Sequence, residues 1–356
     1  MRPPGFWRAG KGQCSAWPVL LSPLAAAFGR VAAARNRRLD AGRGVHRAAI
    51  PVISVGGLTV GGGGKTPTAL AVAGMLVAMG RSVAIASRGY GGRPGRDPLR
   101  VRPDLDWRRV GDEPLILART LSGVPVYAHP NRVRSAARAA ADGADALVLD
   151  DGFQHRRLHR DLDVVALDAS EPLGNGCLLP AGPLREPVSA LGRAGAIWLT
   201  RADQTAEHEL TRARELAARH APTAALVLGA FRAEGLIPLG RAGERSLDDL
   251  RGARVHLLAG IGAPDGFVRT ARSLGARVVG RSFFPDHHPY RAADLRRVAA
   301  AAGDADLVLT TEKDAVRLVG LPLTGSLPVH YLRVRPAVLS GGEALRELLS
   351  AAVGPG

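Results

Sequence analysis

The chain contains, at positions 52–68, the stretch Val52-Ile-Ser-Val-Gly-Gly-Leu-Thr-Val-Gly-Gly-Gly-Gly-Lys-Thr-Pro-Thr68. A β-branched run leads into a glycine-rich turn, and an apolar helical pattern, Ala69 to Met79, follows it. Strand, glycine-rich loop and helix in this order are typical of a P-loop, where backbone amides and the helix N-terminus hold a phosphate. We therefore predict a nucleotide site here, formed by Thr59, Gly61, Gly62, Gly63, Gly64, Lys65 and Thr66.

Two side chains of this loop suit phosphoryl chemistry, because Lys65 can reach the β- and γ-phosphates and the Thr66 hydroxyl can ligate Mg²⁺. The pattern G-x-x-x-x-G-K-[ST] is incomplete, since Thr59 stands at its first glycine, and a turn that merely joins strand to helix is the alternative. Composition favours the P-loop. The chain has 48 Lys and Arg together, yet only Lys11, Lys65 and Lys313 are lysine, so a compact charge was kept here.

The remaining pattern indicates two α/β domains. A length of 356 residues fits about two domains, and 46% hydrophobic residues can fill their cores. Alternating strand and helix patterns predict a P-loop NTPase-type parallel sheet flanked by helices, with a second, smaller α/β domain. We expect an N-terminal helical segment over 1–48, a P-loop domain over 49–222, and over 223–356 the smaller domain, closing over the active-site cleft. Strands are expected at 52–55, 82–87, 124–127, 146–149, 164–167 and 196–199, then at 225–228, 255–258, 277–279, 307–310 and 329–332.

Charge and the N-terminal segment suggest an anionic partner. The formal net charge of +16 attracts nucleotides, nucleic acid or an anionic membrane alike. The apolar stretch 17–28 is too short to span a bilayer, but with the arginines that follow it fits a helix lying in the membrane interface. A helix packed on the protein itself is the alternative. Cys14 and Cys177 form no disulfide framework, so we expect a reducing compartment and no structural disulfide.

Carboxylates that could hold a metal follow the strand expected at 146–149. Asp150 and Asp151 have the position of a Walker B element, although an Asx turn would look the same. His155 and His159 have the spacing of a zinc pair, but there is no Glu between them and no cysteine cluster, so zinc is disfavoured.

Candidates for the base that accepts a hydroxyl proton are Asp112 and the triplet Asp286-His287-His288. Helix capping explains Asp112 equally well, and a solvated loop explains the triplet. Two further charged segments, Leu184-Arg-Glu-Pro187 and Thr311-Glu-Lys-Asp314, are either solvated or functional. In the functional interpretation Arg185 contacts a phosphate and Glu186 supports the Mg²⁺.

Together these segments resemble one family, the tetraacyldisaccharide 4'-kinases, which are the lipid A 4'-kinases of Gram-negative bacteria. The resemblance covers about residues 50 to 315, in family order. It rests on Gly57-Leu-Thr-Val-Gly-Gly-Gly-Gly-Lys-Thr-Pro67, Ser87-Arg-Gly-Tyr-Gly91, Gly111-Asp-Glu-Pro114, Asp150-Asp-Gly-Phe-Gln-His155, Pro180-Ala-Gly-Pro-Leu-Arg-Glu-Pro187, Phe284-Pro-Asp-His287 and Thr311-Glu-Lys-Asp314.

The resemblance implies transfer of the γ-phosphate of ATP, with Mg²⁺, to the 4'-hydroxyl of an acylated glucosamine disaccharide 1-phosphate, an anionic glycolipid. It also implies that the enzyme sits at the cytoplasmic face of the bacterial inner membrane, peripherally or anchored by its N-terminus. No nucleic acid and no obligate protein partner is expected. The implied roles are as follows: Asp112 as base with His287 as its partner, Asp150, Asp151 and Glu186 with Thr66 around the metal and its water, and Lys65 and Arg185 on the phosphates.

Two other functions were considered. Thr200-Arg-Ala-Asp203 is faintly similar to a guanine-reading motif, which would suit a P-loop GTPase or metallochaperone of the cofactor-assembly type. That motif normally has Lys where Arg201 stands, and the chain has no cysteine or histidine tract that could deliver a metal. A nucleic-acid-binding ATPase would suit the charge, but no basic stripe interleaved with aromatic residues supports it.

Overall fold

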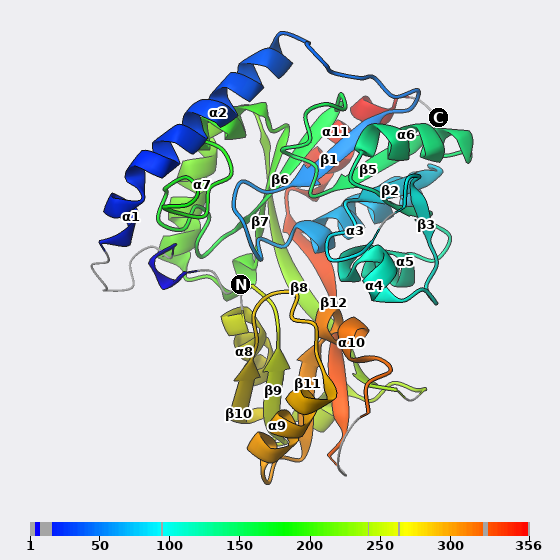
Figure 1. Ribbon diagram of the computed structural model, residues 1–356, viewed down its shortest axis with the longest axis vertical. Coiled ribbons are helices and arrows are strands. Elements are labelled where there is room, and N and C mark those ends of the chain that lie inside the picture. Colours follow the sequence, from blue (N-terminus) through cyan, green and yellow to red (C-terminus); the bar gives the residue numbers. More distant parts are fainter. Residues whose placement is uncertain are drawn as a thin grey trace. The chain divides into compact units, whose positions relative to one another are not determined.

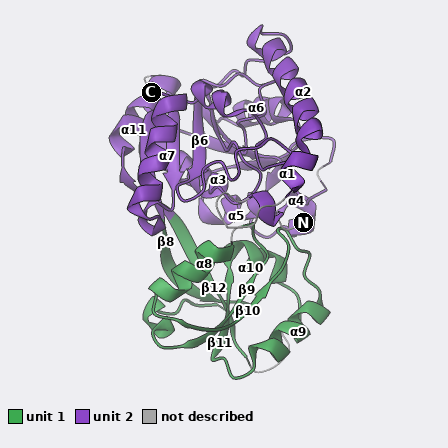
Figure 2. Cartoon of the chain, turned by 90° about the vertical axis from the view of Figure 1, so that its left-hand side faces the viewer, with its two compact units in different colours: residues 1–2, 231–335 green, residues 3–230, 336–356 purple. Residues whose placement is uncertain are grey.

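The structure, a computed structural model, describes residues 4–7, 16–93, 95–240, 242–262, 264–322 and 327–354. The chain forms two compact units, a larger one of residues 3–230 and 336–356 and a smaller one of residues 231–335 (Figure 2). Each unit is built of strands and helices that alternate along the chain (Figure 1). The N-terminal part of the larger unit contains η1 (Gly5–Trp7), α1 (Trp17–Leu20), α2 (Ser22–Asp40), β1 (Val52–Gly56), α3 (Lys65–Ala78), β2 (Val83–Ser87), β3 (Leu99–Val101), α4 (Trp107–Val110), α5 (Asp112–Thr120), β4 (Val126–Ala128), α6 (Arg132–Ala141) and β5 (Ala146–Asp150).

The rest of the chain completes this unit and forms the smaller one. The larger unit continues with β6 (Leu162–Asp168), η2 (Val188–Arg193), β7 (Ala196–Thr200), η3 (Ala202–Gln204), α7 (Glu207–His220) and the start of β8 (Ala225–Pro238). The smaller unit holds η4 (Leu247–Leu250), β9 (Arg254–Ala259), α8 (Pro264–Ser273), β10 (Arg277–Phe283), α9 (Ala292–Ala302), β11 (Leu307–Thr311), α10 (Glu312–Leu318) and most of β12 (Val329–Ser340), after which α11 (Gly342–Val353) belongs to the larger unit.

The larger unit is organised around one sheet with the strand order β8-β7-β6-β1-β5-β2-β4-β3. Each neighbouring pair is parallel except β3 with β4, which is antiparallel. All residues of β1, β2, β5 and β7 are buried, as expected of parallel strands covered on both faces by helices. The predicted fold class is confirmed. The edge strand β3 was missed, because it lies in a stretch rich in Pro, Arg and Asp that looked like a connection.

The register of β1 brings the P-loop next to the carboxylates that follow β5. Val55 lies opposite Asp150 of β5 on one side and opposite Val164 of β6 on the other. Because parallel strands point the same way, their carboxyl ends meet at one edge of the sheet, where ligands of such sheets bind. The sheet thus gathers the loop after β1 and the loop after β5 at one edge.

The larger unit is completed by the C-terminus of the chain. Helix α11 contacts β1 and β6, and the Arg81 guanidinium donates to the Val353 carbonyl oxygen, 3.3 Å away. The sequence analysis had placed these C-terminal residues in the smaller domain and had begun that domain at 223. The difference arises because contact with a sheet formed far upstream leaves no sign in the local sequence pattern.

In the strand order of the sheet, β10-β9-β11-β12 are parallel neighbours, and they belong mainly to the smaller unit. Two buried apolar clusters fill it, one including Val255, Leu257 and Leu309 and the other including Leu258, Tyr290 and Leu318. Adjacent residues of β9 thus point into different clusters, as the alternation of side chains along a strand requires. Both faces of this sheet are therefore packed.

The N-terminal helices α1 and α2 lie on the outside of the larger unit, where Figures 1 and 2 show α2 as one long helix. Within the segment 1–48, for which the sequence predicts helix, α1 and α2 cover Trp17–Leu20 and Ser22–Asp40. Within the described ranges, no helix combines the length and apolar character that crossing a bilayer requires. Cys177 is a free thiol, whereas Cys14 lies outside the described residues.

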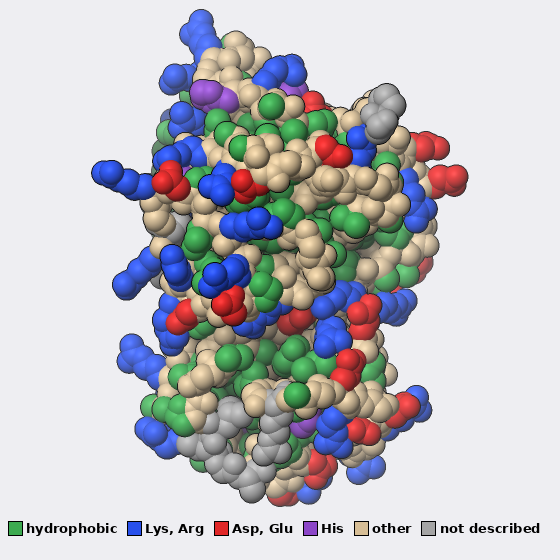
Figure 3. All heavy atoms as spheres, turned by 90° about the vertical axis from the view of Figure 1, so that its right-hand side faces the viewer, with side chains coloured by type: hydrophobic (Ala, Val, Ile, Leu, Met, Phe, Trp, Pro, Cys, Tyr) green, Lys and Arg blue, Asp and Glu red, His purple; other side chains and the backbone are tan. Residues whose placement is uncertain are grey.

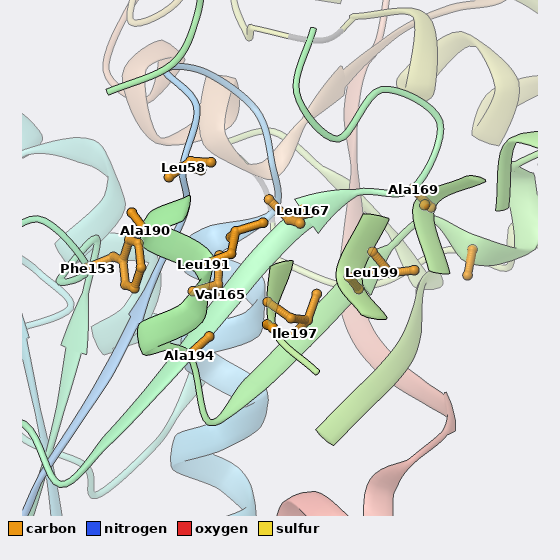
Figure 4. Close-up of a cluster of buried hydrophobic side chains, with 14 of the residues drawn as sticks. Leu58, Phe153, Val165, Leu167, Ala169, Ala190, Leu191, Ala194, Ile197 and Leu199 are labelled. Carbon is orange, nitrogen blue, oxygen red and sulfur yellow. The ribbon is translucent and has the colours of Figure 1, made fainter. Parts of the chain in front are cut away.

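One buried cluster fixes the loops at the carboxyl edge of the large sheet (Figure 4). Leu58 of the P-loop and Phe153 from the loop after β5 are both fully buried in it. They pack with apolar residues of β6, β7 and η2, among them Val165, Ile197 and Leu191. The loops that carry the polar residues of the site are therefore rooted in the hydrophobic core.

Gly56, the last residue of β1, provides a test of this packing. An added Cβ would lie 2.6 Å from both the Cβ and the backbone nitrogen of Phe153. We expect Gly56→Ala to destabilise the larger unit by about 1–3 kcal/mol, because the backbone of a packed core cannot move aside freely. Thermal unfolding would measure this. The matched control is Gly74→Ala within α3, where a Cβ meets nothing within 4 Å and helix propensity should raise stability by about 0.5–1 kcal/mol. Equal melting temperatures for wild type and Gly56→Ala would contradict the expectation.

Candidate active site

The P-loop connects the end of β1 to the start of α3, as predicted. Gly61 and Gly64 have φ values of 106° and 80°, a conformation that favours glycine, and Gly64 is the N-cap of α3. The Lys65 ammonium donates to the Gly61 carbonyl oxygen, 3.1 Å away. This contact holds the lysine over the loop, where a bound phosphate would lie next to the N-terminus of α3.

One side of the P-loop is paired with the segment before Arg185. The Val60 amide donates to the Pro183 carbonyl oxygen at 2.8 Å, and the Arg185 amide donates to the Leu58 carbonyl oxygen at 2.9 Å. The sequence-predicted Thr59 lies in this pairing, opposite Leu184. Backbone hydrogen bonds thus hold the P-loop next to a segment that lies more than a hundred residues further along the chain.

The other side of the P-loop is held by Thr200 and Arg201, directly after β7. The Thr200 hydroxyl donates to the Gly63 carbonyl oxygen at 3.3 Å, and the Arg201 guanidinium donates to the Gly62 carbonyl oxygen at 3.0 Å. Arg201 also forms an ion pair with Asp168 at the end of β6. The sequence of this segment is faintly similar to a guanine-reading motif, whereas in the structure these side chains support the P-loop.

Asp150 is buried beneath the P-loop helix. Its carboxylate accepts hydrogen bonds from the Thr66 hydroxyl at 3.2 Å and from the Ser87 hydroxyl at 3.1 Å. Burial raises the pKa of this carboxyl to about 7, and the negative charges of Glu113 and Asp151 add to the rise. Such a site favours a bound cation, because a cation would neutralise carboxylates that water cannot reach.

Asp151 lies between two cationic side chains. Arg185 Nη1 donates to both carboxylate oxygens at 2.9 Å, and Lys65 Nζ lies 3.7 Å from Oδ1. Burial raises the pKa of this carboxyl, but the charges of Lys65 and Arg185 outweigh burial and hold the pKa at about 2. Asp151 therefore brings together the two cations that the sequence analysis placed on the phosphates.

The residues present fit a magnesium ion. Thr66 and Asp150 offer a hydroxyl and a carboxylate, the hard oxygen donors that Mg²⁺ binds, and Asp151 is adjacent. Among the described residues, no group of three or more His, Cys, Asp and Glu side chains is arranged to hold a metal.

Glu186 was predicted to support the metal, but the structure gives its carboxylate other partners. Asn36 Nδ2 donates to Oε2 at 2.6 Å, and Arg193 Nη2 lies 3.1 Å from both oxygens. Glu186 thus connects α2 to η2, and its support of the metal stays a prediction. The sequence could not show this, because Asn36 and Arg193 lie in segments without a motif.

Asp112 is almost fully buried at the start of α5, directly after Gly111. Its Oδ1 accepts a hydrogen bond from the Glu113 amide at 2.9 Å, so capping is part of its role. Gly111 has a φ of 91°, and an added Cβ would lie 2.6 Å from the Tyr90 carbonyl oxygen. The Ser-Arg-Gly-Tyr-Gly segment therefore packs directly against the segment that carries Asp112.

Arg132 is a functional candidate that the sequence analysis missed. The side chain is almost fully buried, and its Nη2 donates to the Asp150 carbonyl oxygen, 3.4 Å away. Burial lowers its pKa to about 10, which still leaves it charged at neutral pH, and Asp150 and Asp151 oppose the lowering. Its only sequence signal is its place at the start of α6 in an Arg/Ala-rich segment that looks like an ordinary helix.

The two histidines of the suspected zinc pair have separate environments. His155 is partly buried, and its Nε2 has no hydrogen-bond partner. Burial, followed by the charge of Arg132 and then that of Arg35, lowers its pKa to about 4, so it is neutral at pH 7. His159 lies 3.6 Å from Asp161.

In the smaller unit, the structure distinguishes His287 from His288. His287 Nε2 lies 3.1 Å from Lys313 Nζ, which in turn lies 3.2 Å from Asp286. His288 instead stacks on Phe284, with ring centroids 4.6 Å apart, and bonds Asp294 at 3.1 Å. His288 is thus used in packing.

The Thr311–Asp314 segment caps α10 and anchors a buried ion pair. Thr311 Oγ1 accepts from the Asp314 amide at 3.1 Å, and the fully buried Arg317 donates to Asp314 at 2.6 Å. Tyr290 and the Gly260 amide bond the same carboxylate oxygen at 2.8 and 2.9 Å. This network fixes the helix that carries Lys313.

Three of the residues described above have a strained backbone conformation. Among the described residues, the non-glycine positions with positive φ are Asp151, Arg201 and His287, at 53°, 56° and 57°. A left-handed conformation costs free energy in such residues and persists where the surroundings require it, which is common at functional sites.

Comparison with known proteins agrees with this geometry. The family model described as tetraacyldisaccharide-1-P 4'-kinase matches residues 17–354. The chain belongs to this family. The tetraacyldisaccharide 4'-kinase of Anaeromyxobacter sp. (strain K) is 48% identical over 374 residues, covering 98% of this chain and 94% of the relative. The protein of that name from Methylobacterium radiotolerans is 41% identical, covering 99% of each chain.

A solved structure of the 4'-kinase family is also similar. The "apo" form of LpxK from Aquifex aeolicus, described as in complex with ATP, superposes with a TM-score of 0.72 at 28% identity, covering 95% of this chain and 99% of LpxK. These matches confirm the family that the sequence motifs resembled. They give no support to the alternative of a GTPase or metallochaperone.

The buried His155 should make the stability of this 4'-kinase depend on pH. Its pKa is about 4 in the folded chain and near the usual 6.5 in the unfolded chain, so between these values the unfolded chain binds more protons. Above about pH 6.5 the group has no effect on the free energy of unfolding. That free energy should fall as the pH is lowered toward 4.

Denaturant unfolding at pH 7.5, 6 and 5 would measure this effect, with His155→Asn as the comparison. The variant should lose less stability on acidification than the wild type, because it has no imidazole to protonate. Parallel losses in both proteins would show that His155 does not titrate in this way.

Proposed function

We propose that the chain transfers the γ-phosphate of ATP to the 4'-hydroxyl of a lipid A disaccharide 1-phosphate. Membership of the tetraacyldisaccharide-1-P 4'-kinase family over residues 17–354 is the observation that carries this proposal. A buried carboxylate, a P-loop lysine and a second cation at one edge of a parallel sheet are the parts that phosphoryl transfer requires.

The phosphates of ATP would replace Asp151 as the partner of the site's cations. Lys65 and Arg185 pair with Asp151, and each is a group that binds phosphate oxygens. A phosphate chain lying along the P-loop amides would draw both toward itself and stabilise the negative charge that spreads over the transferred group. Asp151 then holds both side chains in place between turnovers.

Thr66 and Asp150 are the residues that would hold Mg²⁺. When bound, it would supply positive charge next to the phosphates. Ser87 fixes the second oxygen of Asp150, which orients this carboxylate toward Thr66. Arg132 supports the same strand end from behind, through the Asp150 carbonyl oxygen.

We infer that Asp112 is the base for the 4'-hydroxyl and that His287 assists it. Asp112 is a buried carboxylate at the N-terminus of α5, a helix that contacts the P-loop helix α3. His287 lies beside Lys313 rather than in the packing that occupies His288. The pairing of Asp112 with His287, like the closure of the smaller domain over the cleft, is a prediction from sequence.

The enzyme is proposed to work at the cytoplasmic face of the inner membrane, where its acylated substrate resides and ATP is available. Helices α1 and α2 expose a set of large apolar side chains, which membrane docking would bury. The net charge of +16 suits general attraction to an anionic surface. Figure 3 shows the right-hand side of Figure 1, opposite α1, where Lys and Arg side chains are spread with carboxylates among them. The exposed apolar residues are Trp17, Val19, Leu20, Leu24, Phe28 and Val31.

Removal of the base should abolish most turnover. Asp112→Asn keeps the shape of the side chain but cannot accept the proton, so kcat should fall by about 10²-fold or more. Phosphate transfer from γ-labelled ATP to lipid A disaccharide 1-phosphate in detergent micelles would measure it, with Lys65→Ala as an inactive reference. His287→Ala should also lower kcat, and its effect should shrink in the Asp112→Asn background if the two act together. Full activity of Asp112→Asn would exclude it as the base.

Loss of the exposed apolar residues should weaken membrane docking. The combined variant Val19→Ser, Leu20→Ser and Leu24→Ser removes side chains that are 75%, 66% and 59% exposed, so folding should change little. Its sedimentation with anionic phospholipid vesicles should drop several-fold, because docking scales with buried apolar area. Val319→Ser is the matched control, since Val319 is 51% exposed in the smaller unit. Equal binding of both variants would argue against docking through α1 and α2.

A further inference from the structure

Two consecutive residues of α2 reach the loops of the phosphate site. Arg35 Nη2 donates to the main-chain oxygen of Gln154 at 2.7 Å, and Asn36 Nδ2 donates to Glu186 Oε2 at 2.6 Å. Their partners lie 119 and 150 residues further along the chain. Both contacts belong to the larger unit.

Gln154 connects Arg35 to the centre of the site. Its Nε2 donates to the Gly57 carbonyl oxygen at 3.0 Å, at the start of the P-loop. Its Oε1 accepts from Arg185 Nη1 at 3.3 Å. The same Arg185 nitrogen bonds Asp151, so a shift of Gln154 changes the position of both the P-loop and the cation beside it.

Glu186 connects Asn36 to the same cation, because it follows Arg185 directly in the chain. Glu186 is 4% exposed, and its carboxylate accepts hydrogen bonds from Asn36 and Arg193. Without Asn36, the carboxylate would keep only Arg193, which lies 3.1 Å from both of its oxygens. The unused acceptor capacity favours a shift of the side chain toward another donor or toward water. Because Glu186 and Arg185 are adjacent in the chain, we expect such a shift to change the position of Arg185.

The second half of α2 is fixed to the larger unit by more than these two bonds. Leu39 is buried, and Arg156 bonds the Asn36 carbonyl oxygen at 3.5 Å and pairs with Asp40. These contacts keep α2 in place when a single site contact is removed. Substitutions at Arg35 and Asn36 can therefore report on the positions of the site residues in a protein that is still folded.

We propose that Arg35 and Asn36 are positioning residues for phosphoryl transfer. Arg35 fixes the position of Gln154, and Asn36 fixes that of Glu186. Through these two residues they fix the P-loop and Arg185, which bind the phosphate that is transferred. The proposal rests on the proposed kinase function but does not require that α2 docks on a membrane.

The test measures kcat, the KM for ATP and the KM for lipid A disaccharide 1-phosphate in detergent micelles, each KM at a saturating concentration of the other substrate, for Arg35→Ala, Asn36→Ala and Asn36→Asp. The alanine variants should lower kcat about tenfold or more, because small displacements of reacting groups are costly. Asn36→Asp keeps the side-chain shape but places a second carboxylate against Glu186. Its kcat should therefore fall at least as much as that of Asn36→Ala. The KM for the lipid should stay near that of the wild type.

Two control variants distinguish loss of a specific contact from a general effect of removing an arginine. Arg35→Lys keeps a cationic donor for the Gln154 carbonyl and should restore most of the kcat lost in Arg35→Ala. Arg212→Ala removes an exposed arginine of α7 in the same unit and should behave as the wild type. Thermal unfolding of each variant shows whether it is folded at the assay temperature.

The outcomes are distinct. If the folded Arg35→Ala and Asn36→Asp variants keep the kcat and KM of an active wild type, the positioning roles are wrong and the kinase function stands. Failure of Arg35→Lys to rescue activity would also count against the role of Arg35. If the wild type itself forms no lipid product, the proposed function is wrong.

Discussion

The close approach of Gly56 to Phe153 is the constraint on which the site depends. No side chain fits between the end of β1 and the loop after β5, so the P-loop and the two aspartates leave the sheet side by side. Phe153 and Leu58 then enter the same core cluster, which roots both loops in packed apolar residues. Polar groups that bind a ligand keep an accurate position only when other contacts fix the backbone that carries them. Here that support is hydrophobic burial just below the site.

Above this core, the arrangement is governed by electrostatics. Two carboxylates that are neighbours in sequence have opposite pKa shifts, because Asp150 is buried among acidic groups and Asp151 lies between Lys65 and Arg185. Asp150 thus favours a bound metal cation. Asp151 neutralises Lys65 and Arg185, two cationic side chains that suit a phosphate anion. The same edge of the sheet is therefore prepared for both a metal and a phosphate chain, and the strained backbone at Asp151 is the conformational cost of turning these adjacent side chains to different partners.

The sequence was most informative where chemistry restricts residue type within a short segment. Glycines, Lys65, Thr66 and Asp150 could be assigned because phosphate and metal binding allow few substitutes there, and the alternation of apolar runs predicted the fold class. It was least informative where distant segments meet. Arg132, Ser87 and Thr200 serve the site through single contacts made by ordinary helices and strands, and Glu186 turned out to bond Asn36. Helix α11 was assigned to the wrong unit for the same reason, since its partners β1 and β6 lie about 290 and 180 residues upstream.

The return of the chain to the larger unit has a consequence for synthesis on the ribosome. The smaller unit is one continuous segment, residues 231–335, and can fold as soon as it has emerged. The larger unit is discontinuous, and β1, although made early, lacks its contact with α11 until residues 342–353 are translated. The nascent chain must therefore keep an incomplete sheet in solution while the whole inserted unit is made. Chaperone binding during translation would be most useful in that interval.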